Sequence, residues 1–135
     1  MNTMTFDVEL NLGFDDTIQQ VEAALKAEQF GIISRIDLHM TFKQKLDVDG
    51  LPHTILGACN PKLAHKAVSA MPAAAVMLPC NVTVQAIENK RTIVRMVSPA
   101  AVLALAGLEN EPVVRQVSEE ADTRLKRVAQ ALAVR

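Results

Sequence analysis

The apolar residues of this chain repeat with two different periods, and the order of these periods predicts the order of strands and helices. Residues 5–12 alternate between apolar and polar side chains, which is typical of a half-buried strand. In residues 15–29 the apolar side chains recur at steps of three and four, which predicts a helix that ends before Gly31. Alternation returns in residues 32–43, so we expect a long second strand with one face in water.

Turn residues and prolines divide the middle of the chain into shorter elements. Residues 47–52 predict a turn, residues 53–59 a third strand, and residues 62–71 a short helix that begins with an asparagine cap and a proline. Residues 73–78 lie between two prolines and show no clear period. We interpret them as a strand or an extended approach to one.

The C-terminal part predicts a hairpin and two further helices. Residues 80–86 and 92–97 flank a turn and are expected to pair, and an alanine-rich segment then predicts a short helix that ends at Gly107. Residues 113–133 predict a long final helix, whose single apolar stripe consists of Val114, Val117, Ala121, Leu125, Val128 and Leu132.

This order of elements predicts a single α+β domain over residues 1–135, with helices packed on one face of a mainly antiparallel sheet. Half of the 135 residues are hydrophobic, which is enough for one sizeable core. Aromatic residues make up only 3% of the chain, so we expect an aliphatic core.

Composition also limits the expected partners. The net charge is -1 and the aromatics are four phenylalanines, so neither a basic surface nor a base-stacking platform for nucleic acid is expected. The N-terminal residues do not resemble a secretory signal, and the apolar stretches are too short to span a bilayer. We expect a cytoplasmic protein without a membrane or nucleic-acid partner. The sequence contains no common nucleotide-binding or hydrolase motif, so it predicts no particular cofactor.

Cys59 and Asn60 lie where the third strand meets the short helix. The unpaired N–H groups and the positive dipole end at a helix start favour a thiolate, and Lys62 and Lys66 add positive charge nearby. A reactive thiol or an anion site is one interpretation. The alternative is that Cys59 is a small buried hydrophobic residue at a tight junction.

Cys80 alternates in phase with Val82 and Val84, so its side chain is expected to face the core, where a lone thiol is inert. A site arises only if the strand ends that carry Cys59 and Cys80 lie side by side. The two thiols would then share a metal, form a redox pair or flank a ligand pocket. The sequence contains neither a C-x-x-C motif nor a standard zinc spacing.

The histidines supply the remaining candidate ligands. His65 lies in the helix that follows Cys59, so Cys59, Cys80 and His65 are the candidate metal ligands, with an exposed surface position as the alternative for His65. Asp37 and His39 lie on the polar face of the second strand, which either lines a groove or meets water. Asp37, His39 and His65 show no charge relay or nucleophile beside them, so we do not expect an enzyme that uses them as acid or base.

Three segments resemble the domain-of-unknown-function family numbered 302: RIDLHMTFKQKL at residues 35–46, ILGACNPKLAHKAV at 55–68 and LPCNVTV at 78–84. The resemblance implies a curved antiparallel sheet backed by helices, of the TATA-binding-protein type, and a homodimer. Domains of this family sometimes accompany sulfur-handling proteins, which implies a thiol-based role only indirectly. The chain has His53 and Thr54 where an aromatic residue is expected, and this departure leaves the shape of the pocket open.

The sequence therefore predicts a homodimeric binding or thiol-redox module for a small anionic or sulfur-containing ligand, with a site formed by Cys59, Asn60, Cys80 and His65. The alternative is a structural or protein-interaction domain, in which an apolar surface drives association and the cysteines fill the core.

Overall fold

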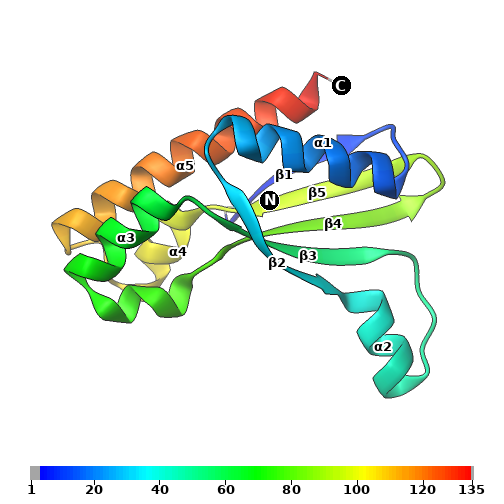
Figure 1. The fold of residues 1–135 in the computed structure, drawn as a ribbon, viewed down its shortest axis with the longest axis horizontal. Coiled ribbons are helices and arrows are strands. Elements are labelled where there is room, and N and C mark those ends of the chain that lie inside the picture. The colour runs from blue at the N-terminus through cyan, green and yellow to red at the C-terminus, as the bar shows by residue number, and fades with distance from the viewer. Residues whose placement is uncertain (1–3, 135) are drawn as a thin grey trace.

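A computed structural model describes residues 4–134 and places five strands in one antiparallel sheet (Figure 1). The order across the open sheet is β1-β5-β4-β3-β2, so β1 and β2 are the two edge strands. The strands are β1 (Thr5–Leu10), β2 (Gly31–Asp37), β3 (His53–Cys59), β4 (Cys80–Glu88) and β5 (Arg91–Val97).

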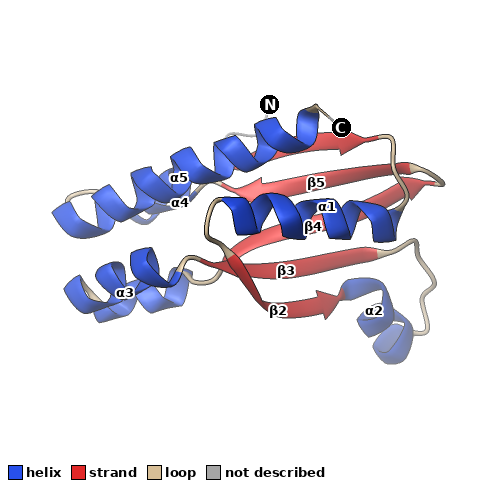
Figure 2. Ribbon diagram, turned by 45° about the horizontal axis from the view of Figure 1, so that its top comes forward, coloured by secondary structure: helices blue, strands red, loops and turns tan. Residues whose placement is uncertain are grey.

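The long helices cover one face of this sheet (Figure 2). Helices α1 (Phe14–Ala27) and α5 (Pro112–Ala133) both pack on the strands and on each other, which confirms the predicted α+β class. The shorter elements α3 (Pro61–Ala70), η1 (Pro72–Met77) and α4 (Pro99–Ala106) gather at one end of the sheet, beside the first half of α5. No helix within residues 4–134 is long and apolar enough to cross a membrane.

The core lies between the two long helices and the sheet. All six residues of the predicted stripe on α5 are buried, as are the inward side chains of the central strands β4 and β5. These side chains are aliphatic, as the low aromatic content predicts. Fully buried examples are Val82, Val84, Val94, Met96 and Leu125.

The predicted strand over residues 32–43 is wrong beyond Asp37. Residues 38–46 form helix α2 (Leu38–Leu46), which projects from the sheet (Figure 1). The last pair between β2 and β3 joins Asp37 to Thr54, and β3 itself begins at His53, so the following residues have no strand to pair with. The alternation of apolar residues in this segment does not mark a face that packs on the core, because no residue of α2 is buried.

The extended segment predicted for residues 73–78 is also wrong, since Pro72–Met77 forms the 3-10 helix η1. Three consecutive alanines favour helical backbone, and a proline suits the first position of a helix. The chain becomes extended only at Leu78, the residue before Pro79, where proline disfavours helical backbone. This short helix closes one side of a pocket at the end of the sheet.

Candidate functional site

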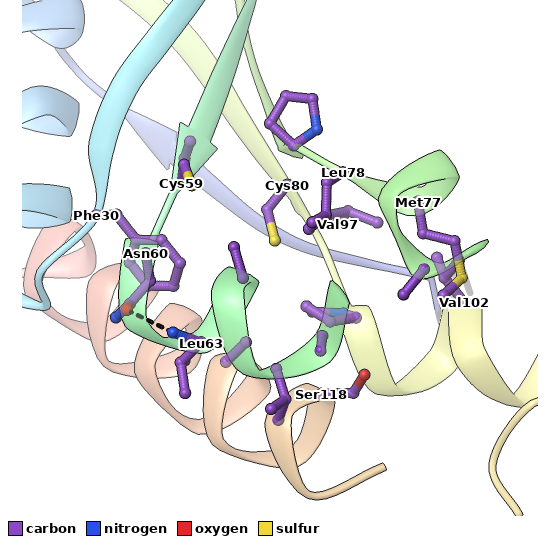
Figure 3. Close-up of a pocket in the computed structure, with 18 of the residues that line it drawn as sticks. Phe30, Cys59, Asn60, Leu63, Met77, Leu78, Cys80, Val97, Val102 and Ser118 are labelled. Carbon is purple, nitrogen blue, oxygen red and sulfur yellow. Dashed lines mark hydrogen bonds between the residues drawn. The ribbon is translucent and has the colours of Figure 1, made fainter. Parts of the chain in front are cut away.

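Strands β3 and β4 bring the two cysteines to the same end of the sheet (Figure 3). In the antiparallel register Ala58 lies directly opposite Cys80, and Cys59 is the next residue along β3. Cys59 ends its strand and Cys80 begins the neighbouring one, so residues that are 21 positions apart in the sequence become neighbours. The strand ends that carry Cys59 and Cys80 therefore lie side by side.

Both cysteines line a pocket of about 250 Å³ between this end of the sheet and the surrounding helices. Helix α3 forms one wall, α5 a second, and η1 and α4 close the remaining sides. The helical walls are made mostly by small or aliphatic side chains, among them Leu63, Ala64, Ala67, Ala74, Met77, Val102, Val114, Val117 and Ala121.

The space exists because α3 and α5 present alanines where they face each other. Ala64 and Ala67 on α3 and Ala121 on α5 leave a volume that longer side chains would fill. A fully enclosed apolar cavity costs ~24 cal/mol per Å³, or about 6 kcal/mol for this volume. That figure approaches the whole stability of a small domain, ~5–15 kcal/mol. Because the pocket is partly open to solvent the actual cost is lower, and an apolar occupant would reduce it further.

The lining is uncharged. Among the pocket residues within the described part of the chain, none is acidic, basic or histidine, and the polar ones are Asn60, Asn81 and Ser118. Lys62 and Lys66, which the sequence suggested as cationic neighbours of Cys59, are exposed on α3 and do not belong to the lining. The site therefore offers no fixed positive side chain to an anion.

Both thiols are free and half-buried. Burial raises the pKa of Cys80 to about 11, and a negative charge on Cys59 contributes in the same direction. Cys80 is thus almost entirely a neutral thiol near neutral pH. The influence of Cys59 on the pKa of Cys80 also means that the two groups interact electrostatically.

Asn60 caps helix α3 (Figure 3). Its side-chain Oδ1 accepts a hydrogen bond from Leu63 N at 3.2 Å, and the residue is only 7% exposed. The predicted capping role of Asn60 is confirmed. Because that oxygen already bonds to the helix, its first role is to hold α3 in place behind Cys59.

His65 lies outside the pocket. It is exposed on α3, where its Nε2 lies 3.5 Å from Ser69 Oγ, and it is not among the lining residues. The structure therefore brings together Cys59, Asn60 and Cys80 but not His65. Over the described residues 4–134, no group of three or more histidine, cysteine or acidic side chains is arranged to hold a metal ion.

Asp37 and His39 lie near the opposite end of β3 from Cys59. Asp37 accepts a hydrogen bond from Thr54 Oγ1 at 2.7 Å, which lowers the pKa of Asp37, and its ion pair with Arg35 acts in the same direction. His39 Nδ1 accepts a hydrogen bond from His53 N at 3.0 Å. Both polar side chains thus help to join β2 and α2 to β3.

The family model described as domain of unknown function DUF302 matches residues 6–132 of the chain. The chain belongs to this family. A similar fold occurs in the crystal structure of an uncharacterized conserved DUF302 protein from Bacillus stearothermophilus, with a TM-score of 0.84 and 24% sequence identity over 97% of this chain and 99% of the other. A comparison with curated proteins finds no match. The finer likeness to the TATA-binding-protein type stays a prediction.

Gly57 is a residue of this DUF302 domain whose role our sequence analysis missed. A Cβ atom at Gly57 would lie 2.1 Å from Ser34 Oγ and 2.7 Å from Pro79 Cγ. The bare glycine therefore lets Pro79, which follows a cis peptide bond, pack against β3 immediately before Cys80. A glycine inside a predicted strand, two residues before Cys59, was the available indication of such a close approach.

Ser118 is a second residue of the DUF302 domain that sequence reasoning missed. It lies on the pocket side of α5, between Val117 and the buried Ala121. A lone serine beside an apolar helical stripe is usually assigned to the surface, whereas here it is only 9% exposed.

Proposed function

We propose that this protein is a small-molecule binding domain whose site is the pocket that carries Cys59 and Cys80. The observation that supports this proposal best is the convergence of two cysteines from separate segments on one mainly apolar pocket. Of the two ligand classes expected from the sequence, a sulfur-containing molecule suits the uncharged wall better than an anion. The proposal assigns the protein to the cytoplasm, where both cysteines stay reduced.

Alkylation of the native protein tests this proposal. N-ethylmaleimide is expected to modify Cys59 in the folded chain, and saturating benzene, a neutral probe for apolar cavities, is expected to slow that reaction. The Cys80→Ser variant isolates Cys59, and the same reaction in denaturant gives the unprotected rate. If both cysteines react only after denaturation and benzene does not bind the native protein, the pocket is not a binding site.

A thiol-redox role is the second candidate, because the paired ends of β3 and β4 place Cys59 and Cys80 at the same end of the sheet. Oxidation would join the two sulfurs and remove two protons and two electrons, which an added oxidant such as diamide would take up as its hydrazine form. Ala58 rather than Cys59 lies directly opposite Cys80, so the two side chains would have to turn toward each other. Rapid formation of an intramolecular disulfide in the native chain supports this role, and formation of mixed or intermolecular products alone excludes it.

We also propose that the protein pairs with a second copy of itself. The support is a β2–α2 face, defined by the exposed Ile33, Ile36, Met40, Phe42, Leu46, Val48 and Leu51. Strand β2 is an edge strand with a free backbone edge, which is a common site for pairing between chains. Residues 33–51 carry three basic and three acidic side chains, so the face suits a copy of itself better than a strongly charged partner.

The competing function is a structural or protein-interaction domain in which the cysteines only fill space. The experiment that separates it from a binding domain is replacement of both Cys59 and Cys80 by alanine. If the double variant keeps its association state and its affinity for benzene, neither thiol contributes to either property; if it keeps its association state but no longer binds benzene, association is its remaining role.

A further inference from the structure

The hydroxyl of Ser118 has no hydrogen-bond partner among the residues that the structure describes. The residue is nevertheless buried, with only 9% of its surface exposed. No side-chain nitrogen or oxygen in residues 4–134 is both cut off from solvent and without a partner, so Ser118 Oγ keeps some exposed surface, and the residue lines the pocket. Thr123 on the same helix behaves differently, because its hydroxyl donates to Glu119 O at 3.0 Å. The Ser118 hydroxyl is thus available to an occupant of the pocket (Figure 3).

The other polar groups of the pocket differ from this hydroxyl. Asn60 uses its side-chain oxygen to cap α3, and Asn81 is exposed, which places it at the mouth. The thiols of Cys59 and Cys80 are weak hydrogen-bonding groups. Ser118 supplies the hydroxyl of the lining and can both donate and accept a hydrogen bond, whereas the side-chain nitrogen of Asn60 can only donate.

The surrounding wall selects against charge. An ionic group beside Ser118 would lie among Val114, Val117 and Ala121 with no counter-charge in the lining. Burial of an unpaired ion is far more costly than burial of a hydroxyl or carbonyl that finds one hydrogen bond. The volume of about 250 Å³ corresponds to about eight water molecules at ~30 Å³ each, which suits a short aliphatic molecule.

We infer that the pocket takes an uncharged, mainly aliphatic molecule with one hydroxyl or carbonyl group, and that Ser118 forms the hydrogen bond to this group. This inference rests on the proposed binding function and names the chemical class of its ligand. The small alanine side chains of α3 and α5 leave room for the aliphatic part of this ligand.

Calorimetric titration of the full chain with three probes of equal length tests the ligand class. Octanol, octanoate and octylammonium each contain eight carbons in an unbranched chain, and the two ions keep their charge near pH 7. Octanol is expected to bind at least tenfold more tightly than either ion. Benzene serves as an apolar probe without a hydrogen-bonding group.

Four variants test where the ligand and its hydrogen bond lie. Ser118→Ala is expected to weaken octanol binding about three- to tenfold and to leave benzene binding unchanged, since only octanol loses a hydrogen bond. Ser118→Thr keeps the hydroxyl and should restore octanol binding, which separates loss of the bond from damage to the fold. Ala64→Leu should weaken both probes at least tenfold by filling the space, whereas Ala70→Leu, exposed at the end of the same helix, should not.

The outcomes separate the inference from the proposed function. If octanoate or octylammonium binds as tightly as octanol, or if Ser118→Ala leaves octanol binding unchanged, the inferred ligand class or the role of Ser118 is wrong. Protection of Cys59 by benzene would then still support a binding pocket. If neither benzene nor octanol binds, both the inference and the proposed function are contradicted.

Discussion

At the scale of single residues, Gly57 lets Ser34 of β2 and Pro79, which precedes β4, pack closely against β3. A methyl group at this position would overlap Ser34 Oγ and Pro79 Cγ, at 2.1 and 2.7 Å. We expect Gly57→Ala to lower the free energy of unfolding by about 1–3 kcal/mol, as overpacked core sites do. Gly31→Ala on β2 is the matched control, because nothing lies within 4 Å of its Cβ position and the change there should be small. Urea denaturation measures both, and equal effects would contradict the close approach.

The pKa of Cys80 gives a second prediction for a single residue. With its pKa raised to about 11, Cys80 holds roughly a hundredfold less thiolate near neutral pH than an ordinary thiol of pKa 9.0. In a Cys59→Ser variant, the alkylation rate of Cys80 should therefore rise about tenfold per pH unit and continue to rise beyond pH 9. Removal of the Cys59 charge shifts this curve slightly toward lower pH. A rate that levels off below pH 9 would mean that burial does not hold this thiol in its neutral form.

At the scale of elements, α4 depends on a buried carboxylate of α5. Asp122, only 8% exposed, accepts hydrogen bonds from Ser98 Oγ and from Ala100 N at the start of α4. We expect Asp122→Ala to cost about 2–3 kcal/mol of stability, because it leaves two donors without their acceptor. Glu119→Ala, exposed on the same helix, should change stability by less than ~0.5 kcal/mol. A thermal or urea unfolding comparison that gives the same stability for both variants would exclude this link.

The elements also show where sequence reasoning succeeds. The hairpin of β4 and β5 and the stripe of α5 were predicted correctly because each buries one face against the core, and burial imposes the apolar period. Helix α2 was missed because none of its residues is buried, so no core selected its pattern. The placement of Cys59 and Cys80 at the same end of the sheet depends on the pairing of β3 with β4, a long-range register that neither segment encodes alone.

The pocket was less predictable than the fold for a related physical reason. Its volume results from alanines on two helices that meet only in the folded chain, and a sequence gives no measure of space left empty. Ser118 was hidden by its small polar side chain beside an apolar stripe. Cys59 and Cys80 were found because thiol chemistry is confined to two residues of the chain.

For the whole molecule, the β2–α2 face predicts association. Sedimentation velocity should give a dimer for the wild-type chain and a monomer for the variant in which Ile33 and Leu46 are both replaced by lysine, since charge there opposes apolar contact. Val76→Lys is the control, because Val76 is 87% exposed in η1 and lies outside the face. A monomeric wild-type chain, or a double variant that still dimerises, would remove the proposed interface.

The ends of β3 and β4, with α3 and α5, enclose an apolar pocket, and we propose that it admits a ligand beside both cysteines. A crystal structure determined under xenon pressure tests this most directly, because xenon occupies apolar cavities and scatters strongly. We expect xenon between α3 and α5, adjacent to Cys59 and Cys80, and its loss in Ala64→Leu. A crystal in which the two helices close over this space, with no xenon beside either sulfur, would contradict it.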